Sequence, residues 1–165
     1  MADINPALET PSDLNRNDTR TVADALNTAL ADCFAIYLKT KNFHWHVSGP
    51  HFRDYHLLLD DQAAQILGVT DAIAERVRKT GNTTLRSIGD ISRHQQIADN
   101  DRDFVPPHEM LAELREDNLK LIETLRDARE RAEAAKDTAT SSIADEWIDQ
   151  AEERAWFLFE ASRKS

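Results

Sequence analysis

The stretch PHFRDYHLLLDDQAAQILGVTDAIAERVRKTGN, residues 50–82, has the pattern of one long amphipathic helix. Its larger apolar residues recur at helical spacings and gather on one side of a helical wheel, which predicts that this side packs on a core. They are Tyr55, Leu58, Ile66, Val69, Ile73 and Val77. Pro50 suits the first turn of this helix, and Gly81-Asn82 ends it after about Thr80.

Three further long helices are predicted on the same grounds. The first is capped by Asn17 or Asp18, runs to about Trp45 or His46, and includes Cys33 and Leu38 in its apolar stripe. The third opens at Pro106-Pro107 and runs to about residue 135, and the fourth follows the turn KDTATSS, residues 136–142, with Phe159 in its stripe. In the connection of residues 82–105, Ile88, Ile91 and Ile97 predict a short helical turn packed on the bundle.

Length and composition favour one all-α domain. The chain has 165 residues, 30% of them charged, with only four glycines and five prolines, a profile that suits helices better than sheets. Four long helices with one long connection predict an up-down four-helix bundle. We therefore expect a flexible N-terminal arm, residues 1–17, followed by the bundle domain, residues 18–165.

Charge and cysteine content indicate the expected compartment and the expected binding partners. The single cysteine cannot form an internal disulfide, and we expect it in the core of a protein from a reducing compartment. No run is long and apolar enough to span a membrane, and the first residues lack the pattern of a signal peptide. A cytoplasmic protein is expected. The net charge of -10 makes DNA binding doubtful.

The polar side of residues 50–82 carries the chemistry. His56, Asp60, Asp71 and Glu75 fall within about 100° on a helical wheel, away from the apolar side. A solvated outer face would explain such residues. However, His56/Asp60 and Asp71/Glu75 are both pairs at i, i+4, each spaced to contact one cation, and the two pairs are symmetric about the point between Gln65 and Ile66. That symmetry favours a metal site over a solvated face.

One chain alone does not bring these two pairs together. Asp60 and Asp71 are separated by about 16 Å along a helix axis. A twofold axis between Gln65 and Ile66 would place a second copy of the helix antiparallel on the first, so that each pair meets the other pair of the partner. Ala64 and Leu67 would then face one another, and Gly68 would let the backbones approach closely. The pattern predicts a dimer whose mixed imidazole and carboxylate ligands suit iron, manganese or zinc.

The same residues resemble a family signature. The chain is similar to the Dps proteins, mini-ferritins named as DNA-binding proteins from starved cells. The motif residues are His44-Trp45, Gly49 with Phe52, His56 with Asp60, and Asp71 with Glu75-Arg76. The resemblance covers roughly residues 18–162, including Trp156-Phe157 near the end of the fourth helix.

This resemblance implies a ferritin-like four-helix bundle with a short helix between helices two and three, assembled as a hollow dodecamer. It implies a ferroxidase that oxidises Fe(II), preferably with hydrogen peroxide, and stores Fe(III) mineral inside, which protects against oxidative damage. The implied site holds two irons between two chains. His44, His56 and Asp60 are its ligands from one chain, and Asp71 and Glu75 come from the twofold partner.

Several positions depart from the family pattern or have two readings. Leu57 stands where many members carry an acidic nucleation residue, which leaves Asp61 as a candidate. His46 and His51 are either auxiliary ligands or surface histidines, and Trp45 is either an electron donor or a core residue. Acidic residues near the start of helix four either line an iron-entry pore or form a solvated face. They are Asp137, Asp145, Glu146 and Asp149.

Three alternative functions are weighed against the ferroxidase. An ordinary ferritin would carry Glu-x-x-His motifs on its helices, and this sequence has none. A DNA-compacting nucleoid protein with little enzymatic role is disfavoured by the absence of a lysine-rich tail. A purely structural helical oligomer would use the His and Asp cluster only to form an interface.

Overall fold

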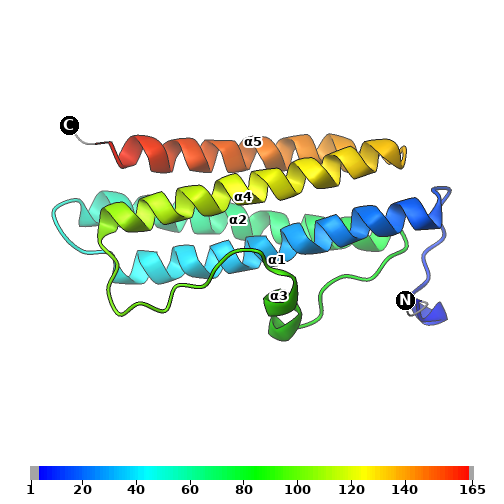
Figure 1. Ribbon diagram of the computed structural model, residues 1–165, viewed down its shortest axis with the longest axis horizontal. Coiled ribbons are helices and arrows are strands. Elements are labelled where there is room, and N and C mark those ends of the chain that lie inside the picture. Colours follow the sequence, from blue (N-terminus) through cyan, green and yellow to red (C-terminus); the bar gives the residue numbers. More distant parts are fainter. Residues whose placement is uncertain (1–3, 164–165) are drawn as a thin grey trace.

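The computed structural model describes residues 4–163, and every regular element in that range is helical. A short 3-10 helix, η1 (Pro6–Leu8), is followed by α1 (Arg16–His46), α2 (Phe52–Lys79), α3 (Ile88–His94), α4 (Pro107–Ala134) and α5 (Thr138–Ala161). The four long helices lie alongside one another as a bundle, and short α3 sits outside it next to α1 (Figure 1). This confirms the predicted all-α, ferritin-like bundle with a short helix in the connection between the second and third long helices.

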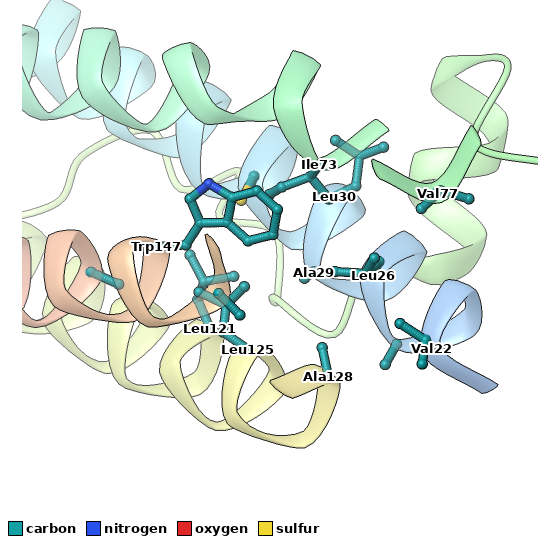
Figure 2. Close-up of a cluster of buried hydrophobic side chains, with 14 of the residues drawn as sticks. Val22, Leu26, Ala29, Leu30, Ile73, Val77, Leu121, Leu125, Ala128 and Trp147 are labelled. Carbon is teal, nitrogen blue, oxygen red and sulfur yellow. The ribbon is translucent and has the colours of Figure 1, made fainter. Parts of the chain in front are cut away.

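The main core lies where α1, α2, α4 and α5 meet. Figure 2 shows Leu26 and Leu30 of α1 near Ile73 of α2, Leu125 of α4 and Trp147 of α5. Ile66, Ile73 and Val77 are at most 1% exposed, so the apolar side of α2 faces the core as predicted. Cys33 is buried in the same cluster, which confirms its predicted place.

Two predicted helix starts are wrong by a few residues. The cap of α1 is Asn15, whose side-chain oxygen accepts from the backbone N–H groups of Asn17 (2.9 Å) and Asp18 (3.3 Å). α2 begins at Phe52 rather than at Pro50, because Gly49, at φ +108°, starts a turn closed by a bond from Phe52 N to the Gly49 carbonyl. The predicted end is confirmed, since α2 stops at Lys79 and Gly81 follows at φ +82°.

The predicted N-terminal arm contacts the bundle in its described part. Arg78 of α2 donates from Nη2 to the Leu8 carbonyl (2.7 Å) and from Nη1 to the Asn82 carbonyl. The Thr10 carbonyl lies so close to Gly81 that a Cβ there would come within 2.9 Å of it. One guanidinium therefore ties residues 8–10 to the end of α2. Residues 1–3 of the predicted arm lie outside the described residues.

Some predicted core positions are exposed. Leu38 is 59% exposed and Phe159 is 42% exposed, although both lie in apolar stripes. α3 buries none of its own residues, and Ile88 is 80% exposed, so only Ile97 of the predicted isoleucines enters the core. Helical spacing identifies an apolar side but does not say whether another element covers it. Within residues 4–163 no helix is long and apolar enough to cross a membrane.

Candidate metal centre

His44 and His56 meet where the end of α1 lies beside the start of α2. The Nδ1 of His44 is 2.8 Å from the carbonyl oxygen of His56, and the Nδ1 of His56 is 2.9 Å from the carbonyl oxygen of His44. A carbonyl oxygen only accepts, so Nδ1 carries the hydrogen in both rings. In a neutral imidazole Nε2 then keeps its lone pair for a metal ion. The rings are stacked, with centroids 3.8 Å apart.

Asp60 lies one helical turn beyond His56 and completes a group of three. Its Oδ1 is 3.8 Å from the Nε2 of His44 and accepts a hydrogen bond of 2.7 Å from the Nζ of Lys41. That hydrogen bond lowers the pKa of the Asp60 carboxyl. A protein cation therefore contacts the same carboxylate oxygen that lies near His44.

Sequence reasoning did not identify Lys41. Its position three residues before His44 on α1 was the available signal, because residues at that spacing share a face. Lys41 also lies 5.9 Å from the ring centroid of Trp45. Trp45 is 60% exposed, so the reading of Trp45 as a core residue is wrong.

Asp71 and Glu75 lie further along α2 and do not join the first three residues within one chain. Both are exposed, and Glu75 forms an ion pair of 3.0 Å with Lys79 of the next turn. Across residues 4–163 no group of three or more His, Cys, Asp or Glu residues is arranged to hold a metal ion by itself. α2 is one continuous helix from Phe52 to Lys79, and both pairs lie on it.

A partly buried ion pair holds the C-terminal half of α2 in place. Arg76, next to Glu75, donates to the Oδ1 of Asp137 (3.0 Å) and to the hydroxyl of Thr140 (2.7 Å). Asp137 is 2% exposed and caps α5 by accepting from the Thr140 N–H. Both predicted roles of Asp137, in a pore or on a solvated face, are therefore wrong. Asp145, Glu146 and Asp149 are exposed on α5.

The remaining singled-out residues lie at the surface. His46 and His51 are exposed, and the Nδ1 of His46 is 2.7 Å from the Asn42 carbonyl. Asp61 and Leu57 are exposed on α2. The arrangement supplies two imidazoles and one carboxylate on one side of α2, and two more carboxylates at the symmetric position along the same helix. Such a donor set suits a redox-active divalent metal such as iron.

Comparisons with known proteins agree with this donor pattern and fold. Residues 23–163 match the ferritin-like domain family. The DNA protection during starvation protein of Agrobacterium fabrum is 32% identical over 150 residues, covering 91% of this chain and 93% of that protein.

Solved structures extend the likeness to three dimensions. An archaeal Dps homologue from Halobacterium salinarum superimposes with a TM-score of 0.90 at 28% identity, covering 99% of this chain and 93% of that one. DpsC from Streptomyces coelicolor gives a TM-score of 0.91 at 25% identity, covering 95% and 92%. The chain belongs to the Dps family of ferritin-like proteins.

Proposed function

We propose that two copies of this chain share two identical iron sites and that the protein is a ferroxidase. In each site His44, His56 and Asp60 come from one chain, and Asp71 and Glu75 come from its twofold partner. The observation that carries the proposal is the incomplete group at His44. Both Nδ1 atoms face carbonyl oxygens, which leaves the Nε2 atoms available for a metal ion, and the Nε2 of His44 lies near Asp60. Within residues 4–163 of one chain no group of three or more His, Cys, Asp or Glu residues completes the site.

The symmetry of α2 explains how the group is completed. About a twofold axis between Gln65 and Ile66, His56 lies opposite the partner position of Glu75, and Asp60 lies opposite that of Asp71. Asp71 and Glu75 are exposed, so a second α2 helix can reach them without unfolding either chain. An isologous contact of this kind forms both sites at once.

The chemistry follows from the ligand set. Two Fe(II) ions, which are substrates, each give up one electron, and one hydrogen peroxide molecule takes both electrons while its O–O bond breaks. With two protons this yields two Fe(III) ions and two water molecules, so no hydroxyl radical is released. Carboxylates stabilise the Fe(III) product, and the two histidines hold the first ion through Nε2. The Fe(III) is stored as mineral inside a hollow oligomer, for which we expect twelve chains.

The name of one relative raises the question of how this chain could protect DNA. The protein from Agrobacterium fabrum is named for DNA protection during starvation. We infer that this chain protects DNA by removing Fe(II) and peroxide and not by coating it, because its net charge is -10. We expect duplex DNA to show no electrophoretic mobility shift with this protein at low salt. A stable complex that forms there and dissociates with salt would favour the DNA-compacting alternative.

Complementation between two inactive variants tests the shared site. His56→Ala/Asp60→Ala removes one half of each site, and Asp71→Ala/Glu75→Ala removes the other half. Each variant alone should lose peroxide-dependent Fe(II) oxidation. After the two are dissociated, mixed equally and reassembled, half of the dimers are mixed, and each mixed dimer has one intact site of two. The mixture should therefore recover about a quarter of the wild-type rate.

The matched control is Glu123→Ala/Asp127→Ala, an exposed pair at the same spacing on α4, which should keep the wild-type rate. A mixture that stays inactive contradicts a site shared between chains. Unchanged oxidation in both parent variants would instead show that these residues form only a structural interface.

A further inference from the structure

The connection between α3 and α4 forms one wall of a groove along α1. It crosses the outside of α1 (Figure 1). Together they line a groove of about 890 Å³, to which α1 contributes Phe34 and Leu38 and the connection contributes Gln95 and residues 99–103. α3, which precedes this segment, buries none of its residues. The attachment of the connection therefore depends on a few specific contacts.

Hydrogen bonds at two points attach the connection to the bundle. At one end the Oδ1 of Asp32, on α1, accepts a hydrogen bond of 2.6 Å from the backbone N–H of Gln96. At the other end Asn100 donates to the Oε2 of Glu113 (2.8 Å) and accepts from the side chain of Asn42 (3.3 Å). Ile97 is buried between these two points.

Asp32 is an unusual residue for such a contact. It is 0% exposed, and its only side-chain hydrogen-bond partner among the described residues is the hydroxyl of Thr124, at 3.5 Å. A buried carboxylate without an ion-pair partner is costly to keep charged. A second cavity, of about 280 Å³, is lined by Gln96, Thr124 and Lys120, so water would reach Asp32 once Gln96 moves away.

We propose that the contact between Asp32 and the connection depends on protonation. Asp32 holds the connection most tightly when its carboxyl is protonated and less tightly when it is ionised. A protonated carboxyl keeps an oxygen for the Gln96 N–H and loses little by staying buried. An ionised carboxylate regains its hydration when the connection opens. The apolar wall formed by Phe34 and Leu38 is then more accessible at neutral pH than at acid pH.

The direction agrees with the environment of the carboxyl. Burial raises the pKa of Asp32 to about 6, although the amides of Gln96 and Ile97 and the charge of Lys120 act in the opposite direction. Burial also raises the pKa of the neighbouring Cys33 thiol to about 12, so that group stays neutral. Other charged groups line the adjacent cavity or the connection. They are Asp24 and Lys39 on α1, Glu123, Asp127 and Arg131 on α4, and Asp99, Asp101, Arg102 and Asp103 on the connection.

Amide hydrogen exchange on the assembled wild-type protein tests the proposal. Protection factors, corrected for the pH dependence of intrinsic exchange, are measured for the Gln96 and Ile97 amides from pH 8 to pH 5. If opening returns Asp32 to its ordinary pKa of 3.8, protection of Gln96 should rise about tenfold over this range, mostly below pH 6. Protection that stays flat or falls overturns the proposal.

Two variants assign the effect to one carboxyl. Asp32→Asn keeps an acceptor for the Gln96 N–H and should abolish the pH dependence at that amide. Asp99→Asn removes an exposed acid from the connection itself and should keep the tenfold rise. The same pH dependence in Asp32→Asn would overturn the proposal. If that variant does not fold, the wild-type series and Asp99→Asn still decide, because loss of the rise in Asp99→Asn would contradict the role of Asp32.

Discussion

The two halves of α2 carry the two halves of the proposed site, but they are held in different ways. In the N-terminal half, His56 and the adjacent His44 of α1 are locked by reciprocal hydrogen bonds to each other's carbonyl groups. In the C-terminal half, Asp71 and Glu75 are exposed, and their helix is held by the ion pair of Arg76 with Asp137. One half is therefore preorganised at its ligands, and the other only at its backbone.

The largest expected effect is a loss of activity that leaves stability almost unchanged. Asp71→Asn/Glu75→Gln should lower the rate of Fe(II) oxidation at least about 100-fold. It should change the free energy of unfolding by less than about 0.5 kcal/mol, because both residues are at the surface. Stopped-flow oxidation and urea denaturation measure the two effects. A matched Glu123→Gln/Asp127→Asn variant should change neither, and a large loss of stability in the α2 variant would show that Asp71 or Glu75 supports the fold.

A change at Arg76 should have the opposite effect and lower stability, because Arg76 anchors the backbone of α2. Arg76→Ala leaves the buried Asp137 carboxylate without its cation and should lower the free energy of unfolding by about 2–4 kcal/mol. Arg129→Ala breaks a more exposed pair with Asp145 and should cost less than about 1 kcal/mol. His56→Ala, in the other half of α2, should cost about 1 kcal/mol for its one bond to the His44 carbonyl. Equal losses for Arg76→Ala and Arg129→Ala in urea denaturation would contradict the anchoring role.

A change at Gly68, near the midpoint of α2, should affect the stability of one chain and the association of subunits in opposite directions. A Cβ placed on Gly68 would meet nothing within 4 Å, so Gly68→Ala should stabilise the isolated chain by up to about 1 kcal/mol through helix propensity. If a second α2 helix packs closely at this point, the same methyl group should weaken subunit association. Analytical ultracentrifugation would detect the weaker association. Unchanged association with raised stability would place the interface elsewhere on the chain.

Helical periodicity predicted a large part of this comparison. It identified α2, its C-terminal end and the side that carries His56, Asp60, Asp71 and Glu75, because all of these depend on one helix alone. It missed the reciprocal histidine contacts and the Lys41 bond to Asp60, since both arise where α1 crosses beside α2. The burial of Asp137 was missed for the same reason, because it depends on Arg76 of another helix.

Exposure was the other weak point of the sequence prediction. Leu38 and Trp45 have the spacing and apolar character of core residues, yet both are exposed in the single chain. Periodicity finds the side of a helix that is apolar, but burial depends on whether a second element lies against that side. The proposed ligands Asp71 and Glu75 have the same property, because they are exposed in one chain and only a partner chain would cover them.

The smallest expected effect concerns the lysines that now contact the two halves. Lys41 donates to Asp60 at 2.7 Å with a side chain only 18% exposed, whereas Lys79 and Glu75 are both more than half exposed. A metal ion must displace Lys41, so Lys41→Met should tighten anaerobic Fe(II) binding about three- to tenfold, and Lys79→Met less than about twofold. Equal effects would mean that both lysines act only through net charge.

Loss of Lys41 also removes the hydrogen bond that lowers the pKa of Asp60. That pKa should rise, so protons compete with Fe(II) at a higher pH in Lys41→Met than in the wild type, which carboxyl NMR titration would detect.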